Sequence, residues 1–482
     1  MCHTLCHSFF LDCHEPIDKN MAIGKKERQL PKTLIGFNFT QFQDLLRSSG
    51  DESALISVSE ARLIPAMKKA SDELQLASVT LSALRMIREF REKVFAEIGM
   101  KRNGKFYYYT ELSLNGSEYP NYRLDGVILQ VISDKIKDAA IIEFKSAKAS
   151  VDSEQIEDYI QFSRKNLGIN KIVSISSEFT SGSKVLPYEL DKRLTKNFNV
   201  YHLSWSYLKT LANLLLFDND ENIEDEDQVL LMHEVLEFLE DENVGLKGYQ
   251  SMNSGWKQVA ADFKNGVQSK EPILRETVYA WHQEQNDMAH ILSKHLGVMV
   301  KTFSKSKSGN LEKMLDDEIK SLKKSGQLMF DLGIKGSFSD IAVIADFTSN
   351  TVSMEVEVTP PLSSETKSKG RLSWLYKQLS KCNLKNPDDF EALADDIFIE
   401  VKQKHLRNNV KVSIHDWGDI LNRLDKGRDI VEFKISYQKN LRKAFIQPKS
   451  FVNETEQMML NYYAVVVQYL KSWTPPQPRF ND

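Results

Sequence analysis

The chain has 482 residues, enough for two or three domains that each bury a core of their own. Its net charge of −4 does not mark it as a nucleic-acid binder, although a catalytic groove needs only local positive charge. No apolar run approaches the roughly 18 residues that cross a membrane, so we expect no membrane partner.

The first thirty residues are expected to form a disordered leader. Cys2, Cys6 and Cys13 lie there, each followed directly by a histidine. Adjacent Cys and His seldom both ligate one tetrahedral zinc ion, and the pattern of a secretory signal is missing. We interpret the segment as a leader, or as translated upstream sequence before a start at Met21. Only Cys382 lies elsewhere, which excludes a disulfide framework and indicates a reducing cytoplasm.

Helical patterns follow the leader. Residues 31–80 predict a helical lead-in that packs on the next domain. From Leu84 to Gly99 the apolar residues recur at intervals of three or four and a glycine ends the run, which predicts one amphipathic helix. Its polar face carries Glu89 and Glu92, which are either solvated carboxylates or members of a site.

Two predicted strands then bring charged side chains to one sheet edge. The first strand opens on Asp125, and in the second, 141–145, alternation places Glu143 and Lys145 on the same face. Two carboxylates and an ammonium that converge in this way can hold a hard divalent cation beside a phosphate. The lysine then lies near the attacking water.

A helix and a buried strand complete this arrangement. The helix begins near Ser153 and carries Gln155 and Tyr159 one turn apart on one face, and the strand spans 171–175. An Asp strand, an E-x-K strand, a Q-x-x-x-Y helix and a further strand resemble the PD-(D/E)XK nuclease superfamily, in particular its RecB-type branch. Leu124 stands where the family name has proline, at a position that varies.

The resemblance implies a restriction-endonuclease-like core, a mixed sheet flanked by helices, over residues 81–216. It also implies a site for Mg²⁺ or Mn²⁺ and a hydrolytic mechanism in which lysine positions or activates water. The implied metal ligands are Asp125, Glu143, the carbonyl of Phe144 and Glu89, with Glu92 or Glu111 as alternatives to Glu89. The implied catalytic residues are Asp125, Glu143, Lys145, Gln155 and Tyr159, of which the last two orient the metal site or hold the strand backbone.

The rest of the chain divides at an acidic run. Residues 217–228 are nearly all acidic or amide and predict an exposed linker. Residues 229–482 predict a C-terminal α/β domain with a regulatory or nucleic-acid-binding role. This region resembles the long C-terminal part that a group of large bacterial proteins couples to a PD-(D/E)XK core.

The C-terminal half repeats the helix–strand–Asp–strand–acid–helix order of the first. Asp340 opens one strand, and Glu355 and Glu357 end the next. The lysine two residues after the acid is missing, so a second site would activate water poorly. We interpret the repeat as a degenerate nuclease-like copy used for packing or for binding nucleic acid, with chance similarity as the alternative.

Together these features predict a metal-dependent nuclease, with DNA preferred to RNA, in phage defence or DNA repair. The alternative is a silent nuclease-fold protein that acts as a nucleic-acid-binding or scaffold module. Predicted nucleic-acid contacts are Lys148, Arg371 and Trp374, because cations interleaved with aromatics suit strand binding. No P-loop or nucleophile elbow is present, so an ATPase or a trigger would come from a protein partner. We interpret His202 as a structural residue. The sequence is compatible with either a monomer or a homo-oligomer.

Overall fold

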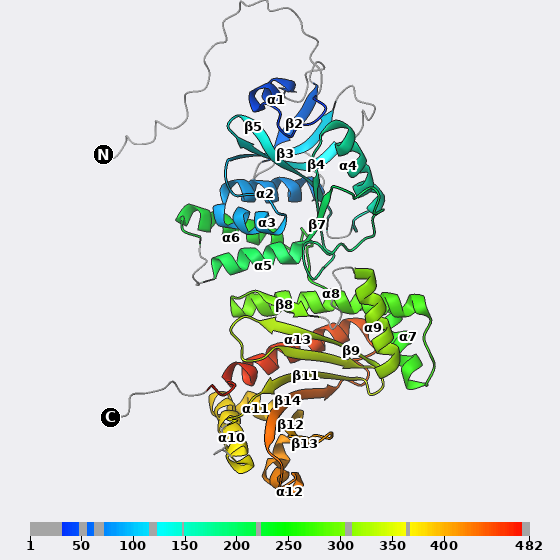
Figure 1. The fold of residues 1–482 in the computed structure, drawn as a ribbon, viewed down its shortest axis with the longest axis vertical. Helices are drawn as coiled ribbons and strands as arrows, with labels where there is room; N and C mark the ends of the chain where they lie inside the picture. The colour runs from blue at the N-terminus through cyan, green and yellow to red at the C-terminus, as the bar shows by residue number, and fades with distance from the viewer. Residues whose placement is uncertain are drawn as a thin grey trace, which may run out of the picture.

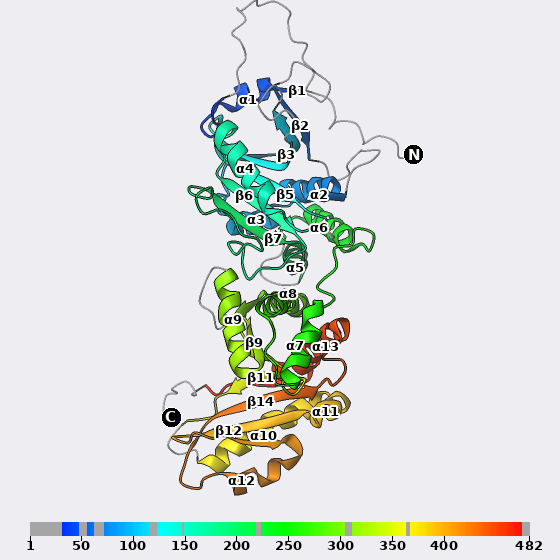
Figure 2. The same cartoon turned by 90° about the vertical axis from the view of Figure 1, so that its right-hand side faces the viewer.

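The computed structural model is an elongated molecule with two halves, each organised around a seven-stranded sheet (Figures 1 and 2). The protein is mixed α/β, as expected. The structure describes residues 31–47, 55–61, 72–114, 123–146, 149–217, 223–303, 311–362 and 367–474. The leader predicted for residues 1–30 and the predicted contact Lys148 lie outside these ranges. Across the described ranges, no helix is both long and apolar enough to cross a lipid bilayer.

The N-terminal sheet follows chain order from β1 to β7. Strands β2 to β5 form an antiparallel meander, whereas β6 and β7 add parallel to β5. Parallel neighbours need a crossover, and helix α4 (Ser153–Asn166) supplies the one between β5 and β6. The strands are β1 Leu46–Arg47, β2 Ile56–Glu60, β3 Lys105–Leu114, β4 Arg123–Ile132, β5 Lys135–Phe144, β6 Lys171–Ser176 and β7 Asn199–Ser204.

Helices cover both faces of this sheet. One core joins a sheet face to α2 (Asp72–Met86), α3 (Arg88–Glu97), α5 (Trp205–Leu216) and α6 (Glu226–Glu240). A second core joins the opposite face to α1 (Phe39–Leu45) and α4. Alternation along β5 produces both, because Ile141 belongs to the α4 core and Ile142 to the other.

Two predictions for the start of this half are wrong. The expected helix from Leu84 to Gly99 is interrupted at Ile87, which has extended backbone angles (φ −110°, ψ 107°) and is fully buried. The next residue, Arg88, donates its backbone N–H to Gln228 Oε1 of α6 at 2.8 Å, so tertiary contacts hold the break. Within the described part of 31–80, α1, β1 and β2 precede α2. The alternating Ile-Ser-Val-Ser stretch of β2 pairs with β3 instead of forming a helix.

The acidic linker is shorter than predicted, because its last residues are helical. Asp225 caps α6 by accepting from the backbone N–H of Gln228, and the two residues after Asp225 are acidic, which suits a helix N-terminus. Met232 and Val235 of α6 lie in the core that contains α2 and α5. Helix α6 therefore packs with the N-terminal half, although its sequence position placed it in the C-terminal domain.

The C-terminal sheet is antiparallel throughout, in the order β13-β12-β14-β11-β10-β9-β8. The helices of this half share one core with its apolar face. The strands are β8 Val300–Phe303, β9 Gln327–Ile334, β10 Ile341–Asp346, β11 Thr351–Val358, β12 Ile397–Gln403, β13 Val410–Ser413 and β14 Ile430–Asn440. The helices are α7 Ser254–Lys264, α8 Glu271–Leu296, α9 Leu311–Ser325, α10 Ser368–Lys385, α11 Pro387–Ala394, α12 Ile420–Arg423 and α13 Pro448–Val465.

Candidate active site

Strand pairing places Asp125 of β4 beside Glu143 of β5. Gly126 pairs with Ile142, so extending the antiparallel register by one residue sets Asp125 opposite Glu143. The backbone N–H of Phe144 donates to Asp125 Oδ2 at 3.1 Å, which holds this carboxylate against β5. The side chain of Glu143 is only 1% exposed. The half-buried carboxylate of Asp125 and the buried carboxylate of Glu143 therefore lie together at the end of β5.

Lys145 directs its ammonium into the same position. Its Nζ lies 2.7 Å from Glu143 Oε1 and donates to Gln155 Oε1 at 2.7 Å. Its backbone is fixed on both sides, because its N–H donates to Ile175 O at 2.9 Å and its carbonyl accepts from Trp205 Nε1 at 2.8 Å. Glu143 and Gln155 thus hold the ammonium, while Ile175 and Trp205 hold the backbone that carries it.

Helix α4 contributes the two residues that the sequence predicted for it. Gln155 and Tyr159 lie one turn apart, and the Tyr159 hydroxyl donates to the Arg123 carbonyl at 3.4 Å, at the start of β4. Burial raises the pKa of Tyr159, and the negative charges of Glu143 and Asp125 raise it further. The phenol therefore stays protonated and can donate a hydrogen bond.

The charges at the site are strongly coupled. Burial and the adjacent negative charge of Glu143 raise the pKa of Asp125 to about 8, although the Phe144 N–H and the charge of Lys145 oppose the shift. For Lys145, burial works to lower the pKa, but the hydrogen bond and charge of Glu143, together with the charges of Glu73 and Asp125, outweigh it, so its pKa is raised. Near neutral pH, the two carboxyl groups thus retain a proton beside a charged ammonium.

This donor set fits a divalent cation. Glu143 Oε2 is buried and has no hydrogen-bond partner among the described residues. The positive charge of a bound divalent cation would favour ionisation of both carboxyl groups, and the cation would coordinate Glu143 Oε2. Within the described ranges, no three His, Cys, Asp or Glu side chains gather into a metal-ligand group. Because Mg²⁺ keeps several water ligands, two carboxylates and the Phe144 carbonyl still suit it.

Comparisons of the chain with protein-family models, curated proteins and solved structures find no match. The PD-(D/E)XK resemblance therefore stays a prediction.

The structure adds an acid that the sequence interpretation missed. Glu73, in the first turn of α2, accepts from the backbone N–H of Ser146 at 3.3 Å, and its negative charge acts on Lys145. The only sequence signal was a pair of acidic residues at a helix start, where acids are common for the helix dipole alone. Long-range packing of α2 against the end of β5 makes Glu73 part of the site.

Glu89, predicted as a metal ligand, is not brought to this position. The three acids proposed for that role each pair with an arginine. Glu111 lies on β3 opposite Asp125, between the pairs Thr110–Gly126 and Leu112–Leu124, but its carboxylate is paired with Arg123. The ion pairs are Glu89–Arg88 at 2.7 Å, Glu92–Arg102 at 3.1 Å and Glu111–Arg123 at 2.8 Å. Arg88 also pairs with Glu224, which lies just before α6, so Arg88 bridges the two glutamates. The structure thus replaces Glu89 with Glu73 as the helix acid nearest the site.

The predicted nucleic-acid contacts on α10 do not form an exposed cluster. Arg371 is 4% exposed and donates to the Ile430 carbonyl at 2.6 Å, so its guanidinium stabilises the core instead. Trp374 is half-buried against the same core. This corrects the prediction for Arg371. His202 is fully buried in the N-terminal half, consistent with a structural role.

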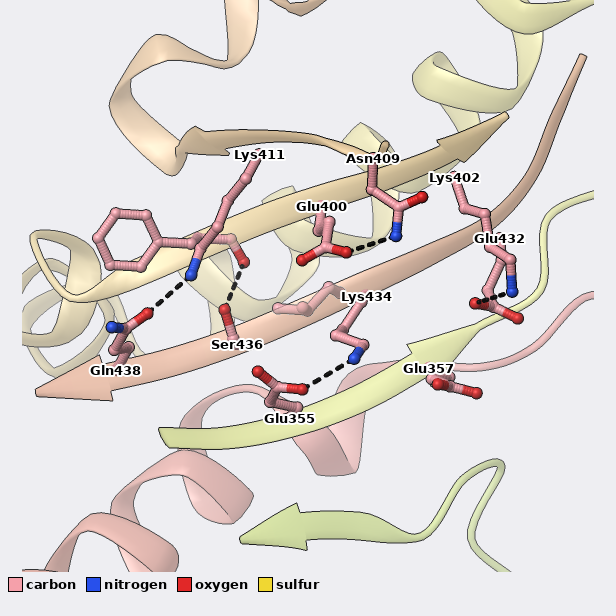
Figure 3. A network of polar contacts seen from close by, with 12 residues as sticks. Glu355, Glu357, Glu400, Lys402, Asn409, Lys411, Glu432, Lys434, Ser436 and Gln438 are labelled. Carbon is pink, nitrogen blue, oxygen red and sulfur yellow. Dashed lines mark hydrogen bonds and ion pairs between the residues drawn. The ribbon is translucent and has the colours of Figure 1, made fainter. Parts of the chain in front are cut away.

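The C-terminal sheet contains a related but looser arrangement. Ala342 pairs with Glu355, so extending that register by two residues sets Asp340 opposite Glu357, as Asp125 lies opposite Glu143. Figure 3 shows polar side chains on the strands of this sheet, where Lys434 of β14 pairs with Glu355 at 2.9 Å. Unlike Glu143, Glu357 is exposed.

Pairing between strands also differs. β14 lies between β11 and β12, whereas β6 pairs directly with β5 in the N-terminal sheet. The order predicted for a degenerate copy is present along the chain, but the sheet is assembled in another way.

Proposed function

We propose that the N-terminal half is a restriction-endonuclease-like core, and that the protein is a divalent-metal-dependent nuclease that hydrolyses phosphodiester bonds, with DNA as its first substrate. The observation that carries the proposal is the carboxylate pair of half-buried Asp125 and buried Glu143, with the Lys145 ammonium 2.7 Å from Glu143. Support for the core comes from the antiparallel β3–β5 meander, the parallel strand β6 and the helix α4 between them.

Asp125, Glu143 and the carbonyl of Phe144 would hold Mg²⁺ or Mn²⁺. A bound divalent cation lowers the pKa of water and offsets the negative charge that grows on the phosphate. Asp125 must give up the proton that it retains near neutral pH before it can act as a ligand.

Lys145 would orient the attacking water and stabilise the negative charge of the transition state. Gln155 fixes the direction of that ammonium through its Oε1, and Glu73 adds a negative charge that keeps the ammonium protonated. Tyr159 offers a protonated hydroxyl near both carboxylates. Each of these groups is held by the fold before substrate binds, which is the condition for electrostatic catalysis.

The test is a cleavage assay with linear, circular and single-stranded DNA in Mg²⁺, Mn²⁺ or EDTA. Lys145→Ala should reduce cleavage by about 100-fold or more. Lys171→Ala is a matched control, because Lys171 is also 13% exposed and also lies 2.7 Å from a carboxylate, that of Asp138 in the same sheet. Equal activity of the two variants would contradict the assignment, as would cleavage that survives EDTA.

One observation favours the alternative of a silent nuclease-fold protein. Two carboxylates converge at the site, but the described residues supply no third ligand side chain. A silent fold predicts that wild type cuts none of the substrates and binds Mn²⁺ no better than Asp125→Asn. The nuclease predicts cutting, and Mn²⁺ binding that the substitution removes.

A further inference from the structure

A polar cavity of about 500 Å³ lies where the two halves meet. Its walls come from α5 of the N-terminal half, from α8 and the start of α13 of the C-terminal half, and from the segment 248–250. Figures 1 and 2 show α5 lying over α8 at this junction, and the two helices are in contact. Cavities of this size bind small organic ligands.

Lys209 of α5 brings a half-buried ammonium group to the cavity. Its ammonium donates to the Leu246 carbonyl, but among the described residues no carboxylate oxygen lies within 4.0 Å of it. Burial lowers the pKa of Lys209, which shows how strongly the site desolvates this charge. The charges of Glu240 and Asp287 favour the charged form of Lys209, and the charge of Lys294 disfavours it. A half-buried ammonium with no carboxylate oxygen in ion-pair range is costly, and an anion in the cavity would compensate for it.

A second lysine reaches the cavity from the other half. Lys449 of α13 is exposed and forms no ion pair with any residue that the structure describes. Lys294 also lines the cavity, but Glu240 already pairs with it at 2.6 Å. The two halves therefore each contribute one ammonium that has no carboxylate partner.

Carboxyl groups line the same cavity. Asp287 of α8 is 4% exposed and accepts from the backbone N–H of Tyr249. Glu456 of α13 makes no hydrogen bond with the described residues. Burial raises the pKa of Asp287 to about 6 and that of Glu456 to about 7. Such groups suit hydroxyl or N–H groups of a ligand, as acceptors when ionised and as donors when protonated.

We propose that this cavity binds a nucleotide-sized phosphate ester, with its phosphate between the ammonium groups of Lys209 and Lys449. Its sugar hydroxyls or base N–H groups bond to Asp287 and Glu456. The site is separate from the Asp125–Glu143 pair and does not depend on the proposed nuclease activity. Because its walls come from both halves, the ligand stabilises their packing.

Binding is measured by calorimetry and thermal unfolding of the full chain in EDTA, with AMP, ribose 5-phosphate and adenosine as probes. AMP or ribose 5-phosphate should bind and raise the unfolding temperature, and adenosine should do so far less. Lys209→Met and Lys449→Ala should each weaken binding by about tenfold or more. Lys294→Gln is the matched control and should keep affinity within about threefold, because Glu240 already offsets its charge.

Lys449 is exposed, so Lys449→Ala keeps the test valid if Lys209→Met fails to fold. Lys145→Ala must retain binding, since a loss there would place the ligand in the candidate active site and overturn the proposal. The proposal is also overturned if neither phosphate compound binds at millimolar concentration, if adenosine binds as well as AMP, or if both lysine variants bind as wild type does.

Discussion

Asp125→Asn should remove activity and yet stabilise the metal-free protein at neutral and higher pH. The substitution keeps the shape of the side chain, and the amide oxygen can still accept from the Phe144 N–H that bonds to Asp125 at 3.1 Å. It removes the negative charge that burial and Glu143 make unfavourable. The amide nitrogen can also donate to Glu143.

The size of the effect follows from proton linkage. The pKa of Asp125 is about 8 in the folded protein, against roughly 3.9 for an unfolded aspartate. Between these values the folded state holds one more proton than the unfolded state, so wild-type stability falls as pH rises, by up to about 1.4 kcal/mol per pH unit. From about pH 5.5 to about pH 7.5, wild type should therefore lose up to about 2.5 kcal/mol relative to Asp125→Asn.

Urea unfolding in EDTA at several pH values measures this difference directly, because the other titrating groups are common to both proteins. Asp138→Asn is the control: it breaks the 2.7 Å pair with Lys171 in the same sheet, and its difference from wild type should stay flat over this range. If the free energy of unfolding of Asp125→Asn relative to wild type does not increase with pH, the reasoning is refuted. With millimolar Mg²⁺, wild type should be stabilised and Asp125→Asn should not.

Three further substitutions test the contacts around this pair. Glu73→Gln keeps an acceptor for the Ser146 N–H but removes the charge that acts on Lys145, so cleavage should fall by about 10–100-fold with little change in thermal unfolding. Trp205→Phe loses the indole hydrogen bond to the Lys145 carbonyl, and urea unfolding should show a loss of about 1–2 kcal/mol. Lys145→Met leaves Glu143 buried without its cation and should cost about 3 kcal/mol in the same measurement. Lys434→Met, at the half-exposed pair with Glu355, should cost about 1 kcal/mol or less, and equal losses for the two lysines would contradict the role of burial.

The residues that the sequence located correctly are those whose positions depend on local periodicity. Alternation along one strand placed Glu143 and Lys145 on one face, and a short meander was enough to set Asp125 beside them. Helical spacing placed Gln155 and Tyr159 on one face of α4. Each step needed only neighbouring elements in the chain, and the structure brings all five residues together.

The residues that it missed depend on packing between distant segments. Glu73 and Glu89 are both acids on helices before the sheet, and only the break at Ile87 and the docking of α2 decide which of them reaches Ser146. Arg371 carries a charge that the sequence assigns to the surface, yet α10 turns it into the core to bond the Ile430 carbonyl. Neither outcome has a local signature.

Burial, more than the identity of the residues, separates the two halves chemically. Both sheets set an aspartate opposite a glutamate with a lysine close by, but helices cover both faces of the N-terminal sheet, whereas the C-terminal helices share a core with one face. Glu143 is therefore enclosed and its neighbour Asp125 has a strongly raised pKa, while Glu357 stands exposed to solvent. Exposed charges are screened by water and cannot concentrate a field on a cation or a phosphate. This difference in enclosure is why we assign the chemistry to the N-terminal sheet and leave the polar side chains in Figure 3 without a catalytic role.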